Sequence, residues 1–198
     1  AFCGTATAVT VLCGLAEERG EEIAVSEASV LEHLRNDFPQ EWYVHWGFSV
    51  LDAFPCSMKY WLLVSLLQFD GMPFLALAAL LRLHGLNVTV HLPNNSAELF
   101  EVLKLSRRHT AVVLNYGRPA LGQKGLGHYA PIGGMSNHQV LLLDTNAWRY
   151  PSIWVPLDLL WAAVSQPTPR GARRGCLVVS DPHACNQTLA GASAAEKK

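Results

Sequence analysis

The chain has 198 residues, of which 50% are hydrophobic and 16% are charged, a composition that argues against global disorder and for a substantial buried core. This length fits one domain, or one compact domain with two lobes. With 15 basic and 16 acidic residues the formal net charge is −1, so there is no electrostatic reason to expect nucleic acid or an anionic membrane as a partner.

The first part of the sequence has the pattern of helices. Small and apolar residues recur at near-helical spacing over residues 3–18, and Gly20 ends this helix. A second helix is expected over residues 26–38, opening on the N-cap sequence Ser-Glu-Ala-Ser. A third apolar helix is expected over residues 72–84, closed by Gly85.

Farther along the chain the pattern changes from helices to strands. A strand over residues 88–92 and a helix over residues 96–105, capped by Ser96, come first. The strands AVVLNY, GHYAPIGG, QVLLLD and GCLVVS follow, with one further helix over residues 156–164. Helices first and an antiparallel sheet afterwards predict an α+β fold with two lobes, and a cleft between the lobes would suit a site.

No segment has the length of a membrane span. The longest apolar block, residues 60–83, is broken by Asp70, Gly71 and Pro73 into pieces shorter than the roughly 20 apolar residues that a bilayer requires. The sequence opens inside a structural element without a basic leader region, which suggests an incomplete N-terminus with any targeting segment missing. The alanine-rich tail from residue 186 is expected to be disordered.

The five cysteines are odd in number and scattered, and they form no paired spacing typical of a structural zinc site. Such usage is typical of free thiols in a reducing compartment, so a cytoplasmic location is expected. Three N-glycosylation sequons, at Asn87, Asn94 and Asn186, point weakly the other way.

Cys3 is the first candidate for chemistry. It lies in the expected first turn of a helix, where unpaired N–H groups and the helix dipole favour a thiolate and should lower the cysteine pKa. Gly4, Ala6 and Ala8 would let a substrate approach the sulfur. The structural alternative is a small buried residue on an apolar helix, an interpretation that fits Cys13 well.

A thiolate nucleophile needs a base and a group that orients the base. In LGQKGLGHYAPIGGMSNHQVLLLDT, His128 lies between two glycine-rich turns and Asp144 ends an apolar run. Cys3, His128 and Asp144 have the chain order of papain-like enzymes, in which the third residue fixes the imidazole. A hairpin whose polar residues only cap a buried strand explains the same stretch. With eight histidines in the chain, spacing alone leaves both interpretations open.

The surrounding motifs resemble those of the phytochelatin synthase family. The resemblance rests on C-G-x-A near the start, G-x-G-H-[FY]-x-P-I-G-G in the middle, and L-D-x-x-x-x-x-Y-P-x-x-W-V-P-L-x-L-L-W after it. It is close over residues 1–12 and 118–164, looser over 173–183, and weak over 15–108. It implies a papain-like fold, a helical lobe followed by an antiparallel sheet lobe, in one catalytic domain over residues 1–185, with residues 186–198 as a tail.

The resemblance also implies a cysteine acyl-transfer enzyme acting on glutathione. Cys3 would attack the carbonyl of the Cys–Gly peptide bond. His128 would take the thiol proton and later protonate the departing glycine, while Asp144 would orient the imidazole. The γ-glutamylcysteinyl thioester would pass to a second glutathione, giving phytochelatin, or to water, giving γ-glutamylcysteine.

Further residues are assigned to substrate binding by the same resemblance. Arg118 falls where the family has an arginine for the γ-glutamyl carboxylate, a task that suits a bidentate guanidinium; the alternative is a solvated loop arginine. Gly127 would leave room for glutathione beside the imidazole. Tyr150 and Trp154 are expected to pack the wall of the site.

Departures from the family pattern favour hydrolysis or a single transfer over polymer synthesis. The glutamine expected a few residues before the cysteine, where it would form the oxyanion hole, is not in the sequence. Gly122 and Ala147 replace basic residues expected on the side of the second substrate. The cysteine-rich C-terminal region of plant and fungal members is also missing.

The resemblance implies no covalent cofactor. Cadmium or zinc would enter as an activator or as a metal–glutathione thiolate substrate, so no dedicated protein metal site is expected, and the scattered histidines show no ligand spacing. Expected partners are glutathione and metal–thiolate complexes, and a homodimer is compatible with the sequence. Two alternatives remain: a catalytically silent domain that binds thiol peptides or metal, and a papain-like peptidase for another small peptide.

Overall fold

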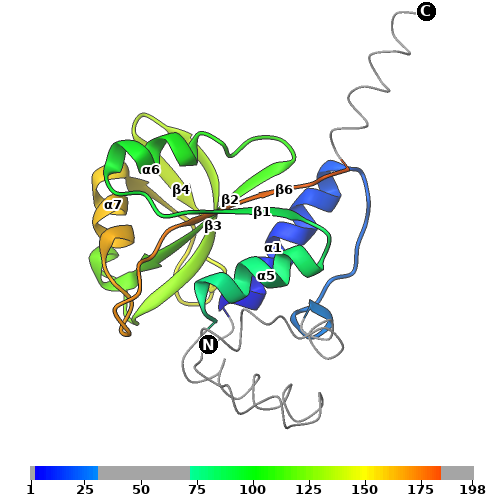
Figure 1. The fold of residues 1–198 in the computed structure, drawn as a ribbon, viewed down its shortest axis with the longest axis horizontal. Coiled ribbons are helices and arrows are strands. Elements are labelled where there is room, and N and C mark those ends of the chain that lie inside the picture. The colour runs from blue at the N-terminus through cyan, green and yellow to red at the C-terminus, as the bar shows by residue number, and fades with distance from the viewer. Residues whose placement is uncertain (1–2, 31–71, 184–198) are drawn as a thin grey trace, which may run out of the picture.

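The computed structural model of the chain describes residues 3–30 and 72–183 (Figure 1). The helices are α1 (Cys3–Glu18), α5 (Phe74–Leu83), α6 (Ser96–Leu103), the short 3-10 helix η2 (Arg118–Leu121) and α7 (Leu157–Ser165). The strands are β1 (Asn87–His91), β2 (Thr110–Gly117), β3 (Gly127–Ser136), β4 (Gln139–Leu142), β5 (Ile153–Pro156) and β6 (Cys176–Ser180). This combination of helices with an antiparallel sheet confirms the predicted α+β class.

The six strands form one sheet in the order β1-β6-β2-β3-β4-β5, and each neighbouring pair is antiparallel. Strand β3 is central to the site because it begins at Gly127 and pairs His128 with Tyr116 of β2. Its pairing with β4 begins only at Ile132, so among the described residues no strand pairs with the first residues of β3 on that side. An edge of β3 is thereby left for another element to cover.

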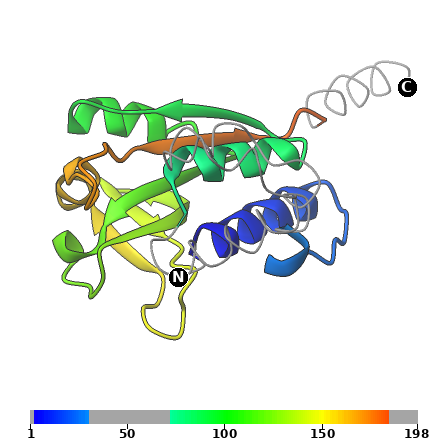
Figure 2. The ribbon, with the colours of Figure 1, turned by 60° about the horizontal axis from the view of Figure 1, so that its bottom comes forward.

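Helices pack on both faces of the sheet. In β2, Val113 packs in a cluster with α1 and α5, whereas its neighbours Val112 and Leu114 pack in a second cluster with α6 and α7. Successive residues of a strand point to opposite faces, so the two helix pairs lie on opposite faces. Figures 1 and 2 show α1 and α5 side by side and apart from α7.

The start of α1 fits tightly against the residue that precedes α5. A Cβ atom added to Gly4 would lie 2.8 Å from Met72, so only glycine allows this approach. The Tyr129 hydroxyl of β3 donates a hydrogen bond to the Met72 carbonyl oxygen at 2.7 Å. The end of α1 that carries Cys3 is therefore packed between α5 and β3.

Most of the predicted elements within the described residues are confirmed. Helix α1 has the predicted bounds and ends before Gly20, whose φ is +75°. The cap at Ser26 is confirmed, since its Oγ accepts the Ser29 N–H at 3.1 Å. Most of the helix predicted over residues 26–38, the first part of the apolar block at 60–83 and the tail at 186–198 lie outside the described residues. No helix within the described ranges is long and apolar enough to cross a bilayer.

Three local predictions need correction. Helix α6 is capped by Asn95 rather than Ser96, because Asn95 is the extended residue and its side chain accepts the Glu98 N–H at 2.8 Å. The strand predicted to deliver Asp144 ends at Leu142, where β4 stops. Strand β5 was not predicted, since it is only four residues long and ends at a proline that also opens α7.

Candidate active site

His128 and Asp144 meet in the interior of the protein. Nε2 of His128 lies 2.8 Å from Oδ1 of Asp144, and the two residues are 4% and 6% exposed. The ring N–H is not aligned with the oxygen well enough to meet the angle of a good hydrogen bond, so the pair is a close polar contact. Because Nε2 faces the carboxylate, Nδ1 is the nitrogen left for another partner.

The interpretation of the segment that contains His128 and Asp144 as a β-hairpin is also confirmed. Strands β3 and β4 are joined by Asn137 and His138, whose φ angles of 48° and 60° are those of a tight hairpin turn. The hairpin brings Asp144, just beyond β4, back to His128 near the start of β3. The two interpretations are therefore not exclusive.

Asp144 is held by several donors besides His128. Nη2 of Arg118 lies 3.2 Å from Oδ1 and 3.1 Å from Oδ2, and the Asn146 N–H donates to Oδ1 at 2.8 Å. Burial acts to raise the pKa of Asp144, but these contacts and the one with His128 outweigh burial and lower the pKa to about 2. The carboxylate is thus ionised across the physiological pH range.

Arg118 is committed to groups of the protein itself. It is 5% exposed, and besides Asp144 its Nη1 donates to Oε1 of Gln123 at 2.6 Å. Its guanidinium carbon lies 4.8 Å from the centre of the Tyr150 ring, within cation–π range. The alternative of a solvated loop arginine is wrong, and the predicted contact of Arg118 with a substrate carboxylate stays a prediction.

The surroundings of His128 favour the neutral imidazole. Burial lowers its pKa, the charge of Arg118 lowers it further, and Asp144 opposes both effects. The Tyr116 ring packs edge-on against the imidazole, with 5.7 Å between the ring centres. Near neutral pH the ring is therefore free to accept a proton.

Replacing Arg118 with glutamine should raise the pKa of His128, since removing a nearby positive charge favours the imidazolium. NMR titration of the histidine ring protons measures this midpoint. Arg149→Gln is the matched control, because Arg149 is exposed and lies 5.7 Å from the same Tyr150 ring. A midpoint that stays fixed or falls in Arg118→Gln would show that Arg118 does not act on the imidazole.

Cys3 is the first residue of α1 and is partly buried against the cluster that contains Tyr129. Burial raises the pKa of its thiol, although hydrogen bonding from the backbone of Tyr129 and Gly4 and the charge of Arg118 act to lower it. The predicted lowering of this pKa is therefore wrong, because packing removes more solvation than the helix start restores. The contribution of Tyr129 also places the sulfur beside the residue that follows His128.

A buried arginine that was not singled out in the sequence lies next to Gly127. Arg174 is 6% exposed, and its Nη1 donates to Oδ1 of Asn115 at 2.6 Å. Within residues 3–30 and 72–183, no carboxylate forms an ion pair with Arg174, and its buried Nε has no hydrogen-bond partner. A Cβ atom on Gly127 would lie 2.6 Å from Nη1, so any larger residue there would displace the Arg174 guanidinium. The sequence feature that could have indicated Arg174 is its place directly before the apolar segment GCLVVS.

Two aromatic residues were expected to pack the wall of the site. Tyr150 contacts Arg118, and its hydroxyl accepts the Lys124 N–H at 2.6 Å, so it joins the loops on either side of the site. Trp154 is 48% exposed on the edge strand β5, on the face opposite buried Val155. About half of its side chain is covered, and its expected place in the wall of the site stays a prediction.

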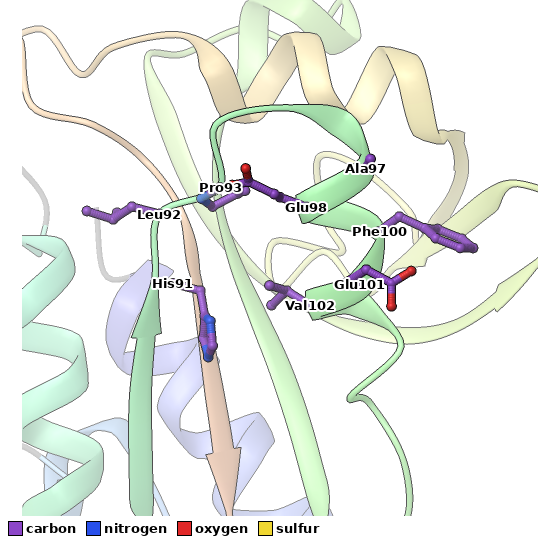
Figure 3. A pocket seen from close by; sticks show the side chains of 8 residues that line it. All are labelled: His91, Leu92, Pro93, Ala97, Glu98, Phe100, Glu101 and Val102. Atoms are coloured by element: carbon purple, nitrogen blue, oxygen red, sulfur yellow. The ribbon is translucent and has the colours of Figure 1, made fainter.

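A groove on the surface is formed by the end of β1 and by α6 (Figure 3). It is lined by His91, Leu92, Pro93, Ala97, Glu98, Phe100, Glu101 and Val102, and none of the candidate catalytic residues is among them. Across the described part of the chain, no three His, Cys, Asp or Glu side chains are grouped in a way that could hold a metal ion. The candidate site is therefore defined by its buried polar groups rather than by this groove.

Comparisons with known proteins agree on one family. The family model for phytochelatin synthase matches residues 1–176. Glutathione gamma-glutamylcysteinyltransferase 3 of Lotus japonicus is 29% identical over 192 residues, which cover 91% of this chain and 34% of the relative. Glutathione gamma-glutamylcysteinyltransferase 2 of Arabidopsis thaliana is 31% identical over 180 residues, covering 86% and 36%. The relative from Schizosaccharomyces pombe is 26% identical over 141 residues, covering 68% and 33%.

This chain spans about a third of the length of these relatives. The family model nevertheless covers nearly all of the chain up to β6 and includes Cys3, His128 and Asp144. The match extends well beyond half of the sequence, and the chain belongs to the phytochelatin synthase family.

Proposed function

We propose that this chain has a papain-like fold and catalyses cysteine-dependent acyl transfer on glutathione. The observation that carries the proposal is the buried contact between His128 and an Asp144 carboxylate kept ionised by Arg118, with Cys3 beside the residue that follows His128. A base whose orientation is fixed by a carboxylate is what a thiol nucleophile requires. The names of the relatives supply the substrate, glutathione.

The pKa shifts favour proton transfer at the moment of attack. Burial raises the pKa of Cys3 and lowers that of His128, so thiol and imidazole are both neutral at rest. Nδ1 of His128 takes the thiol proton as the sulfur attacks the carbonyl carbon of the Cys–Gly bond. The imidazolium then returns this proton to the glycine nitrogen as the C–N bond breaks, leaving a γ-glutamylcysteinyl thioester on Cys3. Asp144 stabilises the transient imidazolium.

Arg174 is the group best suited to bind the carboxylate of the γ-glutamyl unit. A buried guanidinium without a counter-ion is costly, and a substrate carboxylate would supply that counter-ion. Asn115 orients Nη1, and Gly127 adds no side chain of its own beside the guanidinium. This assignment replaces Arg118 with Arg174 as the main substrate anchor, because Arg118 is already paired with Asp144.

Replacing Arg174 with methionine should raise KM for glutathione by roughly a hundredfold while kcat falls much less, since a charge-assisted contact present throughout the reaction is removed. Steady-state kinetics of glycine release measure both constants. Arg173→Met is the control, because the Arg173 guanidinium donates to Leu92 O and Pro93 O instead. An unchanged KM in Arg174→Met would count against this binding mode.

The thioester has two fates: attack by a second glutathione, giving phytochelatin, or attack by water, giving γ-glutamylcysteine. Cadmium or zinc would enter as a metal–glutathione thiolate and thus as substrate. The test incubates the full-length protein with glutathione, with and without each metal, and follows glycine and oligomers by mass spectrometry. Glycine with oligomers indicates synthesis, and glycine without oligomers indicates hydrolysis. No glycine under any of these conditions would overturn the proposed activity.

A catalytically silent domain that binds thiol peptides is the second candidate. The raised pKa of Cys3 favours it, because a buried neutral thiol is a weak nucleophile until a base acts on it. This candidate predicts a calorimetric signal for glutathione binding without release of glycine. The same incubation, followed by titration calorimetry, separates the two functions.

A further inference from the structure

Thr7 makes an unusual hydrogen bond for a threonine within a helix. It is 0% exposed, and its hydroxyl donates to the carbonyl oxygen of Tyr129 in β3 at 3.1 Å. A helical threonine commonly bonds the carbonyl four residues earlier, as Thr10 does with Ala6 at 2.9 Å. The Thr7 hydroxyl instead joins α1 to the strand that carries His128.

The carbonyl oxygen of Tyr129 is available to α1 because of the sheet register. Tyr129 lies opposite Asn115 in β2, but the Asn115 N–H donates to Gly175 O on the side of β6, at 2.9 Å. In an antiparallel pair the N–H and C=O of one residue point to the same side, so Asn115 and Tyr129 do not bond each other. The N–H and C=O of Tyr129 therefore point away from β2, toward the edge of β3 that β4 does not cover.

Helix α1 packs against this edge of β3, where the Thr7 hydroxyl donates to the carbonyl oxygen of Tyr129. Thr7 follows Cys3 by four residues, so both side chains lie on one face of α1. The carbonyl of Tyr129 accepts from Thr7, and hydrogen bonding from the Tyr129 backbone lowers the pKa of Cys3 against the larger effect of burial. One residue of β3 thus contacts both Thr7 and the candidate nucleophile, and His128 directly precedes that residue.

From this geometry we propose that Thr7 is a positioning residue for the candidate nucleophile. Its hydroxyl fixes the position of α1 along the edge of β3, so that the Cys3 sulfur can reach His128. The proposal rests on the acyl-transfer function, because it assigns the hydroxyl to the alignment of that nucleophile and base. Without the hydrogen bond, α1 is still held by its apolar contacts, but the position of the sulfur along β3 is less well defined. A small displacement of a reacting atom is enough to slow a reaction substantially.

The test measures the reactivity of Cys3 without glutathione. Alkylation by iodoacetamide is followed from pH 5 to 10 in the full-length protein, and the modified Cys3 peptide is quantified by mass spectrometry. In Thr7→Val the rate at pH 7 is expected to fall roughly tenfold, and the pH midpoint to move upward, because the imidazole no longer assists the sulfur. Thr7→Ser keeps a hydroxyl and should restore the wild-type profile. Thr10→Val, which removes a hydroxyl of the same helix, should leave it unchanged.

A merely structural role for Thr7 gives a different result. Thr7→Val would then lower the melting temperature without changing the alkylation profile of the folded protein, and this outcome would overturn the proposal. If the valine variant does not fold, Thr7→Ala removes the hydroxyl without adding bulk and repeats the comparison. If the wild type does not release glycine from glutathione, the proposed acyl-transfer function is wrong. That result does not decide the role of Thr7, which the alkylation profiles test separately.

Discussion

Cys3→Ser is expected to abolish glycine release from glutathione, with kcat reduced by roughly a thousandfold or more. A serine hydroxyl is a much weaker nucleophile than a thiol, and the site raises even the thiol pKa by burial. His128 would have to deprotonate a far weaker acid in the same position. Glycine release by the purified variant, measured by mass spectrometry over hours, tests this expectation.

The matched control is Cys13→Ser, which makes the same chemical change in the same helix. Cys13 is a free and partly buried thiol, as Cys3 is, but it lies ten residues farther along α1. Its replacement should leave kcat within about twofold of the wild-type value, because it does not touch the reacting atoms. Equal losses in both variants would mean that Cys3 acts through the packing of α1 and is not the nucleophile.

Asp144→Ala is expected to have the second large effect, on both stability and activity. The change leaves Arg118 buried without its anion, which should reduce the free energy of unfolding by roughly 3 kcal/mol. It also leaves the His128 imidazole without its orienting group, so kcat should fall by roughly a thousandfold in the fraction that remains folded. Urea denaturation and glycine release measure the two effects separately. Asp158→Ala removes an exposed carboxylate of α7 and should cost less than about 1 kcal/mol.

The stability difference between wild type and Asp144→Ala should also depend on pH. The pKa of Asp144 is lowered from 3.8 to about 2, so its ionised form stabilises the fold fully above pH 3.8. That contribution is lost as the pH falls toward 2, where the carboxylate takes up a proton in the folded state as well. Denaturation at several pH values should therefore show that the difference in free energy of unfolding between wild type and Asp144→Ala becomes smaller in acid. A difference in free energy of unfolding that grows below pH 4 would contradict an ion pair between Asp144 and Arg118.

The parts of the fold that could be predicted depend on local patterns. The bounds of α1 followed from the spacing of small apolar residues and from Gly20, whose positive φ ends the helix. The hairpin around Asn137 followed from the glycine-rich flanks and the apolar run of β4. Strand β5 was missed because it has only four residues and is defined by its pairing with β4, which lies earlier in the chain. Short strands have too little pattern of their own to be recognised.

The contact between His128 and Asp144 could be predicted from the sequence, but the electrostatics of these buried groups could not. The motifs brought His128 and Asp144 together correctly, and the 2.8 Å contact confirms that pairing. The pKa of Cys3 could not be predicted from its place in the helix, because the dominant contribution is solvation lost to packing against β3. The partner of Arg118 could not be predicted either, since the choice between Asp144 and a substrate depends on the tertiary position of a short 3-10 helix.

The docking of α1 along the edge of β3 has a consequence for how the molecule folds. Thr7 and Tyr129 are separated by 122 positions, and Arg19 pairs with Asp181 across 162. Contacts between residues so distant in sequence form late, after the loop entropy of the intervening chain has been overcome. Helix α1 precedes the sheet in sequence but acquires its binding surface only when β2, β3 and β6 have paired. We therefore expect the Cys3 thiol and the His128 imidazole to come together only late in folding.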